Sequence, residues 1–98
     1  MLRLFALFLL VTNLHAAPPY PPTIVDARTE VYRTVGEVEL KTWIFGEKVD
    51  GQAKPAILFF FGGGWKAGSP AQFEPQARHL AKRGMIALLV DYRVKSRH

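Results

Sequence analysis

The chain has 98 residues, of which 49% are hydrophobic and 21% are charged. This composition argues against intrinsic disorder and allows one small core. The absence of cysteine excludes disulfides, thiolate metal sites and a lipid anchor on an N-terminal cysteine. The formal net charge is +5, but the basic residues are scattered and no recognition motif accompanies them, so we expect no nucleic-acid partner.

Residues 1–16 have the features of a secretory signal peptide. Arg3 gives a positive start, residues 4–11 are wholly apolar, and Ala16 and Ala17 are small. We expect cleavage after Ala16, because cleavage one residue later would place Pro18 directly after the broken bond. The eight apolar residues span only about 12 Å as a helix, too short for a stable membrane anchor. The protein is therefore expected to be secreted or periplasmic.

Residues 17–29 form a proline-rich, extended lead-in, and the folded domain is expected over residues 30–98. From Glu30 to Phe45 apolar and polar residues alternate, with a break at Gly36. This pattern predicts two antiparallel strands. The polar segment 46–55 predicts a turn before the next strand.

Residues 56–90 are expected to form a strand, a helix and a parallel strand. Residues 56–61 are all apolar, which is typical of a strand covered on both faces. The helix is expected to begin with Ser69 as its cap, with a possible later start because of Pro75, and to end at Gly84. Its core face is expected to comprise Phe73, Ala77, Leu80 and Ala81. The second strand is expected over residues 85–90.

The segment Phe61-Gly62-Gly63-Gly64-Trp65 follows the first of these strands, at the edge where open α/β sheets bind ligands. Three successive glycines allow positive φ angles and leave the backbone amides unobstructed by side chains. Amides held rigidly in such a position can stabilise a negative charge that develops on a substrate oxygen. The segment is therefore a candidate catalytic loop.

This segment resembles the His-Gly-Gly-Gly-Trp/Phe loop of α/β-hydrolase esterases and lipases, in particular the hormone-sensitive-lipase-like branch and its secreted relatives. Asp91-Tyr92-Arg93 is similar to the Asp-Tyr-Arg stretch that those enzymes carry after the next strand. The order of the expected elements over residues 30–92 also agrees. The resemblance implies an α/β fold, the N-terminal part of an α/β-hydrolase.

The resemblance implies that the backbone amides of Gly63 and Gly64 contribute to an oxyanion hole for ester hydrolysis. Gly62 and Trp65 would line the substrate pocket. The substrate would be a small-molecule ester or an ester on a polysaccharide, and neither a cofactor nor a metal is implied. The sequence departs from the family at Phe61, where histidine is usual, and at residues 94–98.

The sequence contains no Gly-x-Ser-x-Gly motif, the nucleophile turn that this fold requires. Ser69 fits a helix cap and Ser96 lies in a basic tail, while His79 and His98 are expected at the surface. We therefore expect the catalytic triad to lie beyond His98 and the 98 residues alone to be inactive. For Asp91 we expect a structural pairing with Arg93 or a loop amide.

Two other functions remain possible from the sequence. Gly62-x-Gly64-x-x-Ala67 with Asp91 could start a dinucleotide-binding unit of an oxidoreductase. The chain could also be a small secreted module without catalytic activity. Against the module, the strand that ends at Val90 would be expected to lie at an open apolar sheet edge, which favours aggregation.

Overall fold

The computed structural model describes residues 19–98, so the expected signal peptide lies outside the described residues. The elements, in chain order, are β1 (Arg28–Val35), β2 (Val38–Phe45), β3 (Ala56–Phe60), the 3₁₀ helix η1 (Pro70–Phe73), α1 (Glu74–Lys82) and β4 (Ile86–Val90). Within residues 19–98, no helix has the length and apolar character needed to cross a membrane.

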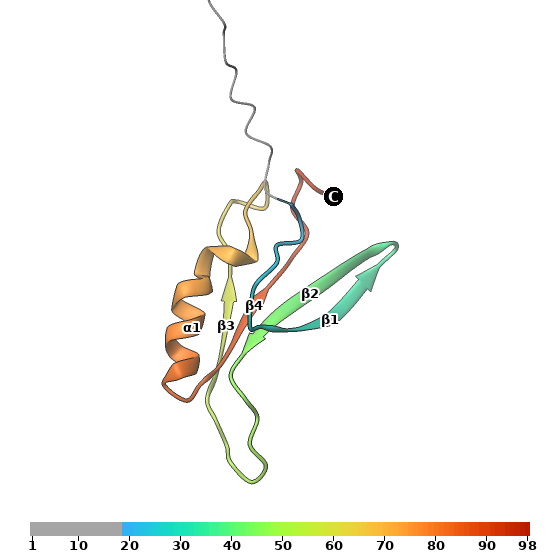
Figure 1. The fold of residues 1–98 in the computed structure, drawn as a ribbon. Helices are drawn as coiled ribbons and strands as arrows, with labels where there is room; N and C mark the ends of the chain where they lie inside the picture. Colours follow the sequence, from blue (N-terminus) through green and yellow to red (C-terminus); the bar gives the residue numbers. More distant parts are fainter. Residues whose placement is uncertain (1–18) are drawn as a thin grey trace, which may run out of the picture.

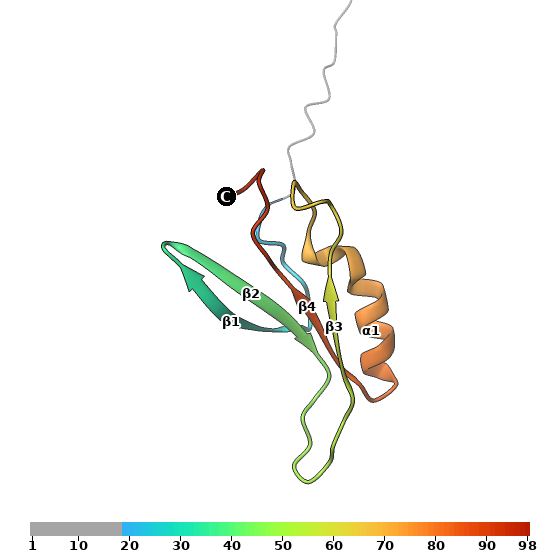
Figure 2. The ribbon, with the colours of Figure 1, turned by 180° about the vertical axis from the view of Figure 1, so that it is seen from behind.

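The strands form one mixed sheet with the order β1-β2-β4-β3 (Figures 1 and 2). The β1–β2 and β2–β4 pairs are antiparallel, and β3 and β4 are parallel. The expected antiparallel pair and the expected strand, helix and parallel strand are both confirmed. The alternating segment 30–45 lies within β1 and β2, and the two apolar runs form β3 and β4. Alternation and continuous apolar runs are both patterns typical of strands.

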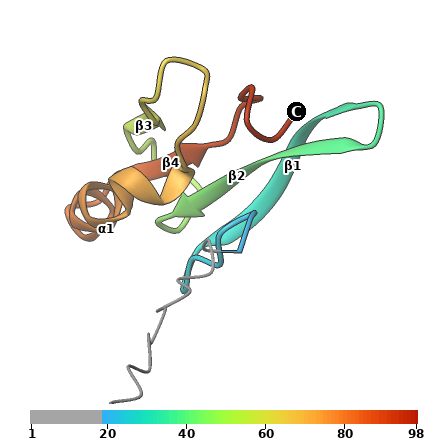
Figure 3. The ribbon, with the colours of Figure 1, turned by 90° about the horizontal axis from the view of Figure 1, so that it is seen from above.

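One face of the sheet carries the hydrophobic core. Its buried residues come from β2, β4, α1 and the segment before β1, and they are Ile24, Trp43, Phe45, Ala77, Ala87 and Leu89. Figure 3 shows α1 and the segment before β1 on the same side of the sheet. The segment before β1 thus packs on the core through Ile24, which is only 6% exposed, and through Ala27.

The other face of the sheet is open at β3. The burial of β3 alternates along the strand, and Leu58 and Phe60 are 54% and 59% exposed. The expectation that residues 56–61 are covered on both faces is therefore wrong for the described part of the chain. A continuous apolar run predicts a strand, but it does not say which other segments cover each of the two faces of that strand.

The second parallel strand, β4, lies inside the sheet between β2 and β3. The expectation that the strand ending at Val90 lies at an open edge is wrong, because β2 pairs with β4 and leaves β3 at the edge. Leu89 and Val90 are 0% and 5% exposed, as expected for a central strand.

The helical segment begins where the sequence predicts. Ser69 caps it, since its Oγ accepts a hydrogen bond from the amide of Ala71 at 3.2 Å. The first turn is 3₁₀, and the α-helix starts at Glu74, in agreement with the later start expected from Pro75. Gly84 follows the helix with a φ of +93°, a conformation that glycine adopts at little cost. The helix packs its buried Ala77 on the sheet.

Candidate active site

The glycine segment forms a tight loop at the carboxyl end of β3. The strand ends at Phe60, and Gly63, Gly64 and Trp65 have φ angles of +148°, +61° and +58°. The amide of Lys66 donates to the carbonyl of Gly63 at 3.1 Å and closes the turn. A Cβ on Gly63 would lie 1.9 Å from the carbonyl oxygen of Ala67, so the loop requires glycine at this position.

The three glycine amides of the loop differ in their partners. The amide of Gly62 donates to Oε1 of Gln72 at 2.8 Å. The amides of Gly63 and Gly64 have no hydrogen-bond acceptor among residues 19–98, and both glycines are exposed. Two unpaired amide donors therefore remain next to each other at the end of β3, as an oxyanion hole requires.

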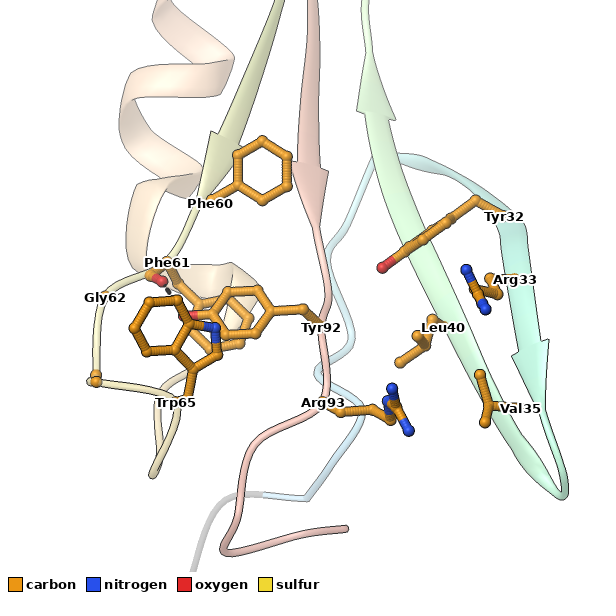
Figure 4. Close-up of a pocket in the computed structure, with 12 residues that line it drawn as sticks. Tyr32, Arg33, Val35, Leu40, Phe60, Phe61, Gly62, Trp65, Tyr92 and Arg93 are labelled. Carbon is orange, nitrogen blue, oxygen red and sulfur yellow. Dashed lines mark hydrogen bonds between the residues drawn. The ribbon is translucent and has the colours of Figure 1, made fainter.

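The loop borders a cleft of about 780 Å³ between the ends of β3 and β4 and the β1–β2 hairpin (Figure 4). Its lining residues are Tyr32, Arg33, Val35, Leu40, Phe60, Phe61, Gly62, Gly63, Gly64, Trp65, Tyr92 and Arg93. The cleft thus brings together all four residues selected from the sequence: Gly62, Gly63, Gly64 and Trp65. Trp65, at the border of the cleft, is 75% exposed.

Tyr92 holds the start of the loop. Its ring stacks on Phe61, with 4.1 Å between the ring centroids and 10° between the planes. Its hydroxyl donates to the carbonyl of Phe61, and Phe61 is only 2% exposed. Phe61, which stands where the related enzymes usually have histidine, is therefore a buried aromatic residue that anchors the loop.

The segment after β4 holds the far side of the loop. The amides of Lys95 and Ser96 donate to the carbonyls of Trp65 and Lys66 at 2.8 Å and 3.0 Å. Arg97 donates from Nη1 to the carbonyl of Gly68 at 2.7 Å. Hydrogen bonds to backbone at several points restrict the motion of the loop and keep its two unpaired amides in place.

Asp91 is 3% exposed and has a structural role. Its carboxylate accepts hydrogen bonds from the Tyr20 hydroxyl and from the amide of Tyr92, the latter at 2.8 Å. The expected loop amide is thus present, whereas the alternative partner, Arg93, forms no salt bridge with Asp91. Burial, followed by the hydrogen bond to Asp91 and the charge of that residue, raises the pKa of Tyr20.

The serines and histidines among residues 19–98 do not form a catalytic group. Ser69 caps the helical segment, and Ser96 and His79 are exposed. The Nδ1 atom of His98 accepts from the amide of Val94 at 3.2 Å. Among residues 19–98, no group of His, Cys, Asp or Glu side chains is arranged to hold a metal ion.

The geometry argues against the dinucleotide alternative. Helical structure starts only at Pro70, several residues after Gly64, so no helix N-terminus meets a ligand at the glycines. The carboxylate of Asp91, which would bind the ribose, is buried and bonded to Tyr20.

Sequence reasoning missed three residues that position the loop: Gln72, Tyr92 in its anchoring role, and Arg97. Tyr92 lies in the Asp-Tyr-Arg stretch, so the motif signalled its importance but not its contact. Gln72 lies on the 3₁₀ turn and reaches back to Gly62, and Arg97 crosses to Gly68. No local pattern predicts these contacts, because each joins residues 10 to 31 positions apart that come together only when the chain folds.

The chain matches no protein-family model and no curated protein sequence, but it is similar to solved structures of Thermogutta terrifontis esterase 2. Against the native esterase the identity is 48% with a TM-score of 0.77, over 83% of this chain and 30% of the esterase. The form phosphorylated by paraoxon and the butyrate-bound form give the same identity and TM-score, over 84% of this chain and 32% and 30% of theirs. The chain spans about a third of the length of these structures.

Proposed function

The chain belongs to the α/β-hydrolase family of esterases, and from this we propose that it contributes the oxyanion hole to a secreted serine hydrolase that cleaves carboxylic ester bonds. The observation that carries the proposal is a pair of exposed glycines beside a cleft at the carboxyl end of β3: the amides of Gly63 and Gly64 have no acceptor among residues 19–98. Membership of the hormone-sensitive-lipase-like branch stays a prediction.

In the proposed reaction a serine attacks the ester carbonyl, and the carbonyl oxygen becomes an oxyanion. The amides of Gly63 and Gly64, with the amide of the residue after the nucleophile, donate hydrogen bonds to this oxygen. These bonds strengthen as the charge develops, and for that reason they lower the barrier more than they tighten substrate binding. Gly62 and Trp65 line the approach of the substrate.

The similarity to esterase structures supports the reaction type. The related esterase has been described with butyrate and propionate bound and in a form phosphorylated by paraoxon. By analogy, we expect this protein to act on esters of carboxylic acids and to react with paraoxon. The ester can belong to a small molecule or to a polysaccharide.

We further propose that the nucleophile, acid and base are supplied by sequence outside these 98 residues. Two observations support this: the chain has no Gly-x-Ser-x-Gly motif, and it aligns with only 30–32% of the related esterase. The chain alone would then hydrolyse no ester. Hydrolysis of a nitrophenyl ester by the purified chain, abolished by Ser69→Ala, would contradict this assignment.

The oxyanion role can be tested with Gly63→Ala in the full-length protein. The added Cβ collides with the backbone of Ala67, so the loop must shift and its amides lose their alignment. We expect kcat to fall by about a hundredfold to a thousandfold, with a much smaller change in KM. Gly51→Ala is the matched control, because Gly51 also has a positive φ of +78° but open space around it. A rise in KM with unchanged kcat would contradict the proposal.

We propose export of the protein on the basis of residues 1–16. Edman sequencing of the protein recovered from the periplasm or the medium is expected to start at Ala17. Recovery of the intact protein with Met1 in the cytoplasm would contradict the proposal.

A further inference from the structure

Two arginines reach the cleft from opposite sides. Arg33 comes from β1 and Arg93 from the segment after β4, and both line the cleft. Figure 4 shows their guanidinium groups pointing into the space between the hairpin and the end of β4. Of the other residues on the hairpin side of the cleft, Val35 and Leu40 are apolar, and the hydroxyl of Tyr32 donates to the backbone carbonyl of Asp91.

A β-bulge in β1 directs Arg33 into the cleft. Val31 pairs with Lys41, but Arg33 pairs with Leu40, so Tyr32 is an extra residue in β1. Without this insertion Arg33 would lie opposite Glu39 and share its face of the hairpin, since directly opposed side chains lie on one face. The bulge instead turns Arg33 away from a carboxylate and toward the apolar Leu40.

Neither guanidinium is neutralised within residues 19–98. The salt bridges of this part of the chain involve Arg28 and Arg78. Both Arg33 and Arg93 are exposed, and no aromatic ring lies under either of them in the described cation–π contacts. The nearby carboxylate of Asp91 is buried and bonded to Tyr20.

We propose that Arg33 and Arg93 make the cleft selective for esters that carry an anionic group, such as a carboxylate, in the acyl or the alcohol part. A guanidinium presents its donors in a planar fork that fits a carboxylate. Two unneutralised guanidiniums at one cleft also raise the local concentration of anions. This inference rests on the proposed esterase function and adds the class of substrate.

The test compares matched pairs of chromogenic esters in the full-length protein. For the acyl part, the nitrophenyl half-ester of adipate is compared with nitrophenyl hexanoate. For the alcohol part, carboxy-nitrophenyl butyrate is compared with nitrophenyl butyrate. The quantity measured is the ratio of kcat/KM for the anionic ester to kcat/KM for its neutral partner.

We expect Arg33→Gln and Arg93→Gln each to lower this ratio by about three- to tenfold for at least one pair. Arg33→Lys and Arg93→Lys should retain most of the ratio, because they keep the charge. Arg83→Gln is the matched control: Arg83 is exposed and caps the far end of α1, and its loss changes the net charge equally. High salt should lower the ratio of the unmodified protein.

The outcomes separate the two proposals. A ratio that is the same in the unmodified protein and in both glutamine variants, for both ester pairs, would overturn the selectivity and leave the esterase function intact. A ratio that falls equally in Arg83→Gln would also overturn it, because the effect would then reflect net charge alone. Failure of the unmodified protein to hydrolyse any of the esters would instead overturn the proposed function.

Discussion

The hydroxyl of Tyr20 donates a hydrogen bond to the carboxylate of Asp91, and this contact ties the start of the described chain to the end of β4. Tyr20 also lies under the guanidinium of Arg97, 3.7 Å from the ring centroid. Arg97 in turn holds the carbonyl of Gly68 at 2.7 Å. The proline-rich segment is thereby connected to the glycine loop through two side chains.

Tyr20→Phe is expected to destabilise the fold by about 1–3 kcal/mol. The substitution keeps the ring under Arg97 but removes one donor to the carboxylate of Asp91, which is only 3% exposed. Urea unfolding of the full-length protein measures the change. In a protein that carries Asp91→Asn, Tyr20→Phe should lower the free energy of unfolding by less. An equal loss of unfolding free energy with Asp91 and with Asn at position 91 would contradict a direct coupling of the two residues.

The stability of the protein should depend on Tyr20 at high pH. Burial raises the pKa of Tyr20 in the folded state, with a further contribution from Asp91, while an unfolded tyrosine titrates near pH 10. The stabilisation by the neutral phenol is therefore complete below about pH 10 and is lost as the pH rises above it. Unfolding free energies measured across this range should decline less steeply in Tyr20→Phe. An identical decline in both proteins would show that Tyr20 titrates normally.

Tyr92→Phe tests the anchor of the loop. The phenylalanine ring can keep its stacking on Phe61, but the hydrogen bond to the Phe61 carbonyl is lost. We expect kcat to fall by up to about tenfold with little change in KM, because a looser loop aligns its amides less well with the oxyanion. Tyr92→Leu, which removes the stacking as well, should have a larger effect. A change in KM alone would contradict a positioning role.

Gly68→Ala is expected to destabilise the protein far more than a substitution at a comparable glycine. A Cβ on Gly68 would lie 2.5 Å from the carbonyl oxygen of Gly62 and 2.5 Å from Cδ2 of the Phe61 ring. Gly84 also has a positive φ, +93°, but has open space around its Cβ position. Gly84→Ala should cost about 1 kcal/mol, and thermal unfolding should place Gly68→Ala well below it. Equal melting temperatures would contradict the tight packing of the loop.

The sequence allowed the strand pair and the parallel unit to be predicted because these depend on local periodicity and burial. The order of the strands in the sheet was harder to predict. Strand β4 lies between β2 and β3, and no local sequence pattern predicts this position. The exposure of β3 at Phe60 was not predicted either, because the same apolar sequence is compatible with a strand that is covered on one face or on both.

The glycine loop was predicted as a candidate site because three adjacent glycines follow an expected strand at the edge where α/β sheets bind ligands, and the resemblance to esterases and lipases implied its oxyanion role. Its supports were not predictable in the same way. Tyr20 and Asp91 are separated by 71 positions, and Gln72 reaches back to Gly62 from the following turn. The bulge that turns Arg33 into the cleft likewise arises only when the two strands of the hairpin pair.

The most direct test of the oxyanion role is an NMR measurement of the loop amides in the full-length protein labelled with nitrogen-15 glycine. A trifluoromethyl ketone analogue of an ester would form a tetrahedral adduct with the nucleophile and place its oxyanion in the site. We predict that the amide protons of Gly63 and Gly64 move strongly downfield in the adduct, while that of Gly51 stays unchanged. Adduct formation without a shift at either Gly63 or Gly64 would contradict the account.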